Sequence, residues 1–124
     1  MPPSPLLNRR WTGFRAEAIA LLYFQQLGYT LLRQNGRLGR AEVDLLMWHP
    51  ILERLVAVEV KYRQCVTSER PLLDRQARRV HRAATALRPP SLCLHEVEMD
   101  LCIVCGDLKS PHIQVFTNVW QGWE

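Results

Sequence analysis

The chain has 124 residues, of which 48% are hydrophobic and 23% are charged. These proportions exclude a disordered or fibrous protein, and the length fits one domain better than two. No apolar run approaches the roughly 20 residues of a bilayer span, and the first residues resemble no signal peptide, so we expect a cytoplasmic protein without a membrane partner. The net charge of +4 at pH 7 is compatible with a nucleic-acid partner but does not establish one.

Hydrophobic spacing predicts a first helix over residues 10–27, after a flexible, proline-rich arm at residues 1–8. Apolar residues recur at helical spacing from Phe14 to Leu22, and Gly28 ends the pattern. This helix is expected to pack one apolar stripe against the rest of the domain.

Alternating and β-branched segments predict five strands, interrupted by a second helix. The strands are expected over residues 29–33, 41–48, 55–62, 97–104 and 113–119. A turn is expected at Asn35-Gly36, and Asp74 is a suitable N-cap for a helix that stops before Pro89. The order α-β-β-β-α-β-β predicts a single α/β domain over residues 9–124, with a central mixed sheet flanked by helices.

Four charged side chains on the second and third strands deserve to be considered together: Glu42, Asp44, Glu59 and Lys61. Within each strand the two members are two residues apart, so they point to the same face. A hairpin that is symmetric about Ile51 and Leu52 places Asp44 opposite Glu59 and Glu42 opposite Lys61. Opposed residues have Cβ atoms about 4.5–5.5 Å apart, and two carboxylates at that distance repel unless a positive group lies between them.

A divalent metal would provide that positive charge. Mg²⁺ takes hard oxygen ligands, commonly one or two carboxylates completed by water and phosphate, and Lys61 would then orient a bound water or stabilise developing charge. The alternative is a solvated sheet face whose charges pair with one another, for example Glu42 with Lys61. Apolar residues on the same face argue for a site, because an acid among apolar neighbours is costly unless it is paired or functional.

A further acid, Glu17, falls on the apolar side of the first helix, between Phe14, Leu21 and Phe24. Two interpretations remain open at this point. The side chain extends to solvent at the margin of the apolar stripe, or it faces the acidic residues of the sheet.

The second helix carries a basic face opposite its apolar stripe, formed by Arg75, Arg78, Arg79 and Arg82. No acid interrupts this face after Asp74, and Gln76 lies beside it in the first turn. Phosphate contact and simple solvation of the outer helix face are the two interpretations.

The four cysteines are expected to be reduced and mostly buried: Cys65, Cys93, Cys102 and Cys105. The Cys102-x-x-Cys105 spacing also permits a zinc site with Cys93 and His95, although that arrangement is not a familiar one.

Several motifs, in this order and spacing, resemble the YraN-like family of small bacterial proteins. They are Gly13-x-x-x-Glu17, Gly28-Tyr29, Asn35, the segments 41–46 and 58–63, Arg75-Gln76 and the segment 99–103. The resemblance covers roughly residues 10–119. That family is similar to the PD-(D/E)xK nuclease superfamily and to archaeal Holliday-junction resolvases, which implies a restriction-endonuclease-like fold.

The resemblance also implies roles for individual residues. Asp44 and Glu59 match the two motif acids, Lys61 matches the motif lysine, and Glu17 matches the acid on the first helix. The chain departs from the family pattern at Ala41, where glycine is usual, at Arg75, where lysine is usual, and in a shorter loop over residues 65–73.

The predicted function is therefore a Mg²⁺- or Mn²⁺-dependent endonuclease acting on DNA, including branched DNA. Asp44, Glu59 and the Val60 carbonyl would hold the metal, and Lys61 would act on the attacking water. Glu17 would assist the metal or the water, and the second helix would contact nucleic acid. By analogy with the resolvases, a homodimer is expected. Two alternatives remain: a nucleic-acid-binding module that does not hydrolyse its ligand, and a protein-interaction domain.

Overall fold

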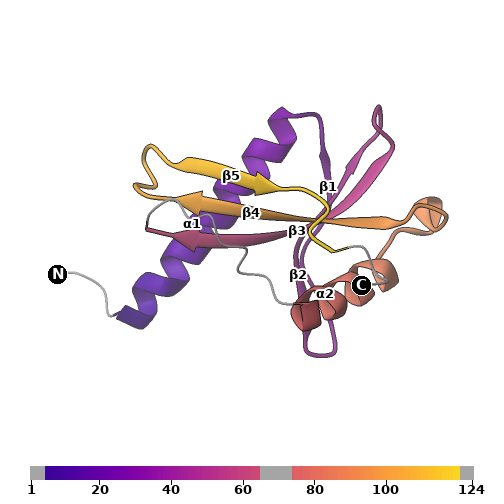
Figure 1. The fold of residues 1–124 in the computed structure, drawn as a ribbon, viewed down its shortest axis with the longest axis horizontal. Coiled ribbons are helices and arrows are strands. Elements are labelled where there is room, and N and C mark those ends of the chain that lie inside the picture. Colours follow the sequence, from indigo (N-terminus) through magenta and orange to yellow (C-terminus); the bar gives the residue numbers. More distant parts are fainter. Residues whose placement is uncertain (1–4, 65–73, 121–124) are drawn as a thin grey trace.

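The computed structural model describes residues 5–64 and 74–120 (Figure 1). Its elements are α1 (Pro5–Gln26), β1 (Thr30–Leu38), β2 (Ala41–His49), β3 (Arg54–Arg63), α2 (Asp74–Ala86), the 3-10 helix η1 (Pro90–Leu92), β4 (Val97–Cys105) and β5 (His112–Phe116). The helix and strand order α-β-β-β-α-β-β confirms the predicted α/β class. The predicted loop at residues 65–73 lies outside the described residues. Neither described helix is both long and apolar enough to cross a membrane.

The five strands form one mixed sheet in the spatial order β1-β2-β3-β4-β5. The β3–β4 pair is parallel and the other three pairs are antiparallel. A parallel pair needs a crossover connection, and the segment containing α2 provides it. The two helices cover opposite faces of the sheet, as Figure 1 shows.

The first half of β3 is buried on both faces, in agreement with its continuous apolar run over residues 55–58. Val56 and Val58 pack in a cluster with α1, whereas Leu55 and Ala57 pack in a cluster with α2. Each helix reaches the sheet mainly through small residues. On α2 these are Ala77, Ala83 and Ala84, together with Val80.

A buried ion pair joins Arg54, the first residue of β3, to Asp100 of β4. Arg54 donates from Nη1 to Asp100 Oδ2 at 2.8 Å and to the Tyr29 hydroxyl at 3.0 Å, and a second guanidinium nitrogen binds Asp100 Oδ1. The Asp100 side chain is 1% exposed, and it also accepts the Asn118 amide N–H at 3.2 Å. This network joins β3 and β4 to the segment before β1 and to the segment after β5.

The first helix differs from its prediction at its start and in its buried face. It begins at Pro5, within the range predicted as an arm, and not at residue 10. Its fully buried residues are Ala16, Ala20 and Phe24, whereas Phe14 is 65% exposed. The N-terminal part of α1 extends past the sheet in Figure 1, and Phe14 lines a cavity instead of packing in the core.

The turn predicted at Asn35-Gly36 is wrong. The strand β1 continues to Leu38, and the chain reverses at Gly39, whose φ is +61°. Asn35 does have a positive φ of +52°, but within the strand, where asparagine tolerates this conformation better than most residues. A Cβ on Gly36 would lie 2.9 Å from Leu87 Cδ1. The glycine therefore lets Leu87, which directly follows α2, pack closely against β1.

The last predicted strand is also shorter than expected, because β5 ends at Phe116. The following residues remain attached to β4: the Val119 amide donates to the Met99 carbonyl at 2.9 Å. Trp120 is consequently buried, with 8% of its surface exposed.

The buried ion pair predicts a large and specific stability loss. Replacing Asp100→Ala leaves the Arg54 guanidinium without its main partner, and we expect the free energy of unfolding in urea to fall by about 3–5 kcal/mol. The control is Arg37→Ala, which breaks an exposed pair with Glu42 and should cost less than about 1 kcal/mol. Equal losses in the two variants would contradict this role for the network.

Candidate functional site

The strands β2 and β3 pair in the predicted register and then separate. Pairs run from His49 with Arg54 to Leu45 with Val58, as expected for a hairpin symmetric about its centre. One residue further, Asp44 Oδ2 accepts a hydrogen bond from the Val60 backbone N–H at 2.8 Å. The Asp44 side chain thus replaces a main-chain bond of the ladder. We call the point where β2 and β3 separate, at Asp44 and Val60, the fork.

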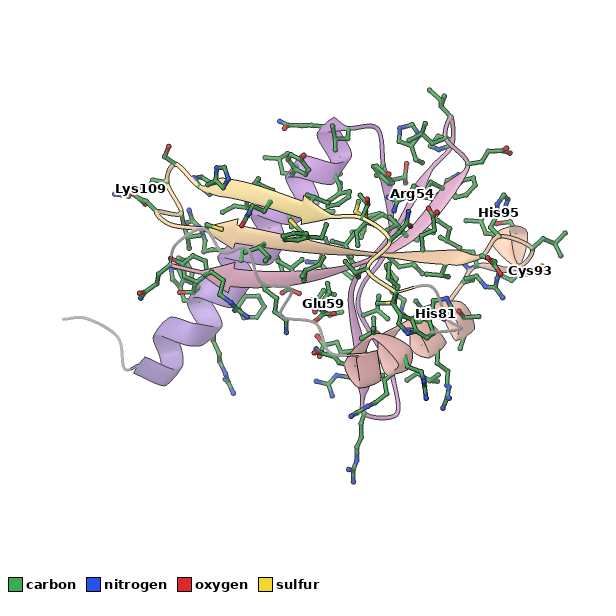
Figure 2. All side chains as sticks on the ribbon, viewed as in Figure 1. Arg54, Glu59, His81, Cys93, His95 and Lys109 are labelled. Carbon is green, nitrogen blue, oxygen red and sulfur yellow. The ribbon has the colours of Figure 1, made fainter. Side chains whose placement is uncertain are left out.

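Glu59 lies in the fork beside Asp44. It is 6% exposed, and its Oε2 atom is buried with no hydrogen-bond partner. Its other oxygen lies 3.6 Å from Lys61 Nζ. In Figure 2 the labelled Glu59 side chain leaves β3 on the side between α1 and α2.

Burial and a nearby negative charge perturb both acids. Burial and the negative charge of Asp44 raise the pKa of Glu59 to about 8, and the nearby Lys61 ammonium only partly offsets this. Burial and the charge of Glu42 also raise the pKa of Asp44, against the hydrogen bond from the Val60 amide. Near neutral pH the pair therefore retains a proton unless a cation takes its place.

The donor set fits a hard divalent cation with few protein ligands. Within the described ranges, no group of three or more His, Cys, Asp or Glu side chains is arranged to hold a metal. Two carboxylates completed by main-chain and solvent oxygens suit Mg²⁺, and the unpartnered Glu59 Oε2 is an available ligand. The N–H and C=O of one strand residue point to the same side, so the Val60 carbonyl faces the fork along with its amide.

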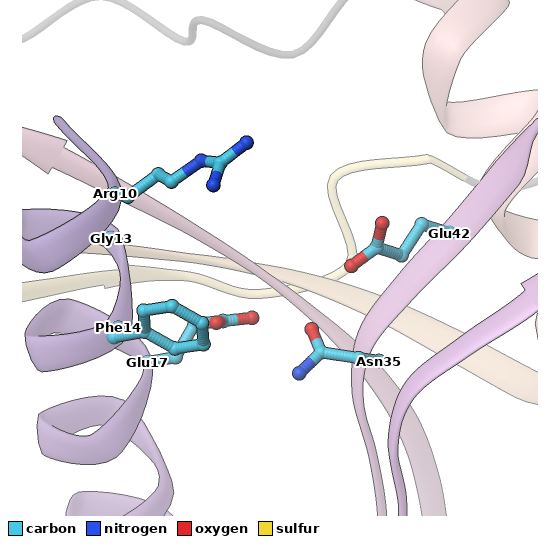
Figure 3. Close-up of a pocket in the computed structure, with 6 residues that line it drawn as sticks. All are labelled: Arg10, Gly13, Phe14, Glu17, Asn35 and Glu42. Atoms are coloured by element: carbon cyan, nitrogen blue, oxygen red, sulfur yellow. The ribbon is translucent and has the colours of Figure 1, made fainter. Parts of the chain in front are cut away.

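Glu17 points from α1 toward Asn35 and Glu42, and the three residues line a cavity of about 490 Å³ (Figure 3). Burial, Asp44 and Glu42, in that order, raise its pKa to about 7. With its nitrogen turned toward the acids, the Asn35 amide donates to Glu17 Oε1 at 2.8 Å and to Glu42 Oε1 at 3.0 Å. Of the two interpretations left open for Glu17, the structure therefore has it facing the acidic residues.

A second cavity, of about 640 Å³, lies on the other side of Gly13. It is lined by Thr12, Gly13 and residues 60–64, including Lys61. Gly13 lines both cavities, and a Cβ there would meet no atom within 4 Å. The first cavity therefore reaches Glu17 and Glu42, and the second reaches Lys61, from either side of Gly13.

One predicted pairing is wrong. Glu42 does not lie opposite Lys61, because β2 pairs with β3 only from Leu45 onward. Glu42 lies before this point and pairs with Arg37 of β1. The Arg37 Nη2 atom lies 3.2 Å from Glu42 Oε2. The alternation predicted along β2 also breaks there, since Val43 packs in the α2 cluster and Leu45 packs in the α1 cluster.

The basic face of α2 is solvent-exposed as predicted. Arg78, Arg79 and Arg82 are exposed, and none forms an ion pair with a carboxylate of the described residues. Gln76 is half-buried in the first turn. The Arg75 side chain lies outside the described residues.

Sequence reasoning missed the role of Asn35, which was assigned only to a turn. Its amide joins acids from two elements, and its presence among the family-like motifs was the available signal. The cysteine prediction is confirmed for Cys102 and Cys105, which are buried, whereas Cys93 is exposed. Burial and the charge of Asp100 raise the pKa of Cys102 to about 12, so this thiol is not reactive.

Comparison with known proteins places this arrangement in a family. The sequence model of the uncharacterised protein family UPF0102 matches residues 16–104, a range that contains Glu17, Asp44, Glu59 and Lys61. The chain belongs to the UPF0102 family. The match confirms the resemblance to YraN-like proteins, and membership of the PD-(D/E)xK superfamily remains a prediction.

Individual UPF0102 relatives agree with the family match. A UPF0102 protein of Brachyspira hyodysenteriae is 41% identical over 61 residues, covering 48% of this chain and 49% of the relative. Another, from Pseudomonas syringae pv. tomato, is 42% identical over 60 residues, covering 48% of this chain and 45% of the relative. The aligned part spans about half the length of these curated relatives.

The raised pKa values predict how stability depends on pH. A carboxyl group with a folded-state pKa near 8 and an unfolded value near 4.5 binds more protons in the folded state between these pH values. Without divalent metal, the free energy of unfolding should therefore fall as the pH rises from 5 to about 8. Glu59→Gln should weaken this decline and be more stable than the wild type at pH 8 by about 1–3 kcal/mol.

Chemical denaturation at several pH values measures this effect. Glu53→Gln is the matched control, because Glu53 is exposed in the β2–β3 turn and its replacement should leave the pH profile unchanged. Parallel pH profiles for the wild type and Glu59→Gln would show that the acids at the fork do not share a proton.

Proposed function

We propose that this UPF0102 protein is a metal-dependent endonuclease that hydrolyses phosphodiester bonds in DNA. The observation that carries the proposal is the Glu59 carboxylate, buried beside Asp44 with one oxygen unpartnered and with a lysine ammonium 3.6 Å from the other. A protein tolerates such a costly arrangement where it is functional, and a cation would relieve it.

Asp44, Glu59 and the Val60 carbonyl are the proposed metal ligands. Mg²⁺ or Mn²⁺ bound there would supply a water of lowered pKa and stabilise negative charge on a phosphoryl oxygen. The hydrogen bond from the Val60 amide holds one Asp44 oxygen in place and leaves Oδ1 for the cation. This hydrogen bond also fixes the distance between the two acidic strands.

Lys61 and Glu17 are the proposed catalytic residues beside the ligands. The Lys61 side chain is 27% exposed, so its ammonium reaches both Glu59 and the second cavity, where it would stabilise charge developing on the phosphate. The pKa of Glu17 near 7 lets a large fraction of this carboxyl group accept a proton at neutral pH. It would take the proton released by the attacking water.

The charge distribution supports a nucleic-acid substrate. Arg10 lines the cavity beside Glu17, and the arginines of α2 have no acidic partner among the described residues. Arginine side chains bind phosphate oxygens in a bidentate manner. We propose Arg75, Gln76, Arg78, Arg79 and Arg82 as the nucleic-acid contacts, and a homodimer as the assembly.

Metal binding is the first test. Calorimetric titration with Mg²⁺ or Mn²⁺ should give one site for the wild type, and Asp44→Asn should weaken binding at least tenfold because it removes a ligand charge. Glu53→Gln changes an exposed acid in the turn and should bind as the wild type does. Equal affinity in all three proteins would reject the proposed metal site.

Cleavage is the second test, on duplex, single-stranded and four-way DNA. With Mg²⁺ present, Glu59→Gln should lower the rate at least a hundredfold, since losing a metal ligand removes stabilisation that water cannot replace. Unchanged cleavage would reject the assignment of Glu59. Salt-sensitive DNA binding without any metal-dependent cleavage by the wild type would instead support a module that binds and does not hydrolyse.

A further inference from the structure

A third cavity lies beside α2 and shares no described lining residue with the two cavities near the acids. It has a volume of about 560 Å³ and is lined by Arg78, His81, Arg82, Thr85, Ala86 and Trp120. Its walls are one side of α2 and the segment that follows β5. Figure 2 labels His81 on this side of α2.

Two hydrogen-bonding groups of this cavity have no partner. The Trp120 indole Nε1 and the Thr85 hydroxyl oxygen are both buried and form no hydrogen bond with any described residue. An indole N–H can only donate, and a hydroxyl group donates or accepts. Buried polar groups are almost always satisfied in folded proteins, so two orphans lining one cavity indicate a missing acceptor.

The charged side chains among the described residues that line the cavity are both arginines. Arg78 and Arg82 are four residues apart on α2, so their side chains lie on the same face of the helix. In the described part of the chain, neither has an ion-pair partner and no carboxylate lines the cavity. The missing acceptor is therefore expected to carry negative charge.

The orphaned indole is held in place by its neighbours. The Val119 amide donates to Met99 O at 2.9 Å, which ties the residue before Trp120 to β4. The His81 ring packs against the indole with centroids 4.7 Å apart, and His81 Nε2 donates to the Val97 carbonyl at 3.0 Å. Trp120 is thus positioned before any ligand arrives, and its N–H cannot easily turn toward another acceptor.

We propose that this cavity binds a phosphate group. Arg78 and Arg82 would provide charged donors, and the Thr85 hydroxyl and Trp120 indole N–H would provide neutral donors. A tetrahedral anion can accept hydrogen bonds from several directions at once, which suits donors that come from a helix and from a separate segment. The inference rests on the proposed function only for the source of the phosphate, which would be a DNA strand held at a fixed point away from the acids.

The test is titration of the full chain with inorganic phosphate, followed by calorimetry and by the NMR signal of the Trp120 indole N–H, assigned with Trp120→Phe. The indole signal should shift on saturation. Arg78→Gln/Arg82→Gln should lose at least tenfold in affinity, and Thr85→Val should lose about threefold, since it removes one neutral hydrogen bond. The matched control is Lys109→Gln, which removes one exposed positive charge in the β4–β5 turn outside the cavity and should change affinity less than twofold.

A stationary indole signal, or equal phosphate affinity in the double variant and Lys109→Gln, would overturn the proposal. The source of the phosphate is then resolved with a DNA oligonucleotide and a nucleoside monophosphate as ligands. Weaker oligonucleotide binding by the double variant alone assigns a strand phosphate, and weaker nucleotide binding alone assigns a soluble ligand. Asp44→Asn should bind phosphate as the wild type does, so failure of the proposed nuclease site and failure of this cavity are distinguishable.

Discussion

The hydrogen bond between the Val60 amide and the Asp44 carboxylate ends the β2–β3 ladder, and the arrangement of the candidate site depends on it. Beyond this point β2 turns to pair only with β1, which opens space between two strands that are otherwise closely paired. The space is then reached by Glu17 from α1, while Glu59 stays on the continuing strand. A regular ladder through Asp44 would have closed the same space with main-chain contacts.

The strand β3 also changes its environment residue by residue. Leu55, Ala57, Glu59 and Lys61 alternate along one face, and the first two are almost completely buried while the Lys61 side chain is 27% exposed. Glu59 lies between the buried residues of this face and the partly exposed Lys61. A carboxylate at this boundary is desolvated enough for a raised pKa and close enough to solvent to receive a cation.

Local patterning predicted most of the elements and the hairpin register, because burial periodicity and turn position are properties of adjacent residues. It also predicted that Asp44, Glu59 and Lys61 lie together. The divergence of β2 from β3 could not be predicted in this way, since a side chain that replaces a ladder bond leaves no periodic signal. Contacts between side chains on different elements leave no periodic signal either. They are the pair of Glu42 with Arg37, the hydrogen bonds of Asn35 and the buried pair of Arg54 with Asp100.

The placement of the sheet's only parallel pair within the described chain bears on how the molecule folds. The antiparallel meander β1–β2–β3 needs only short connections, whereas β3 meets β4 after a long crossover. Closing a long loop costs more chain entropy, so the β3–β4 pair is expected to form more slowly. Every side chain at the fork precedes that crossover. The acidic side chains of the site therefore belong to a stretch of chain that can pair early. The later docking of β4 and β5 completes the burial that raises the pKa of these carboxyl groups.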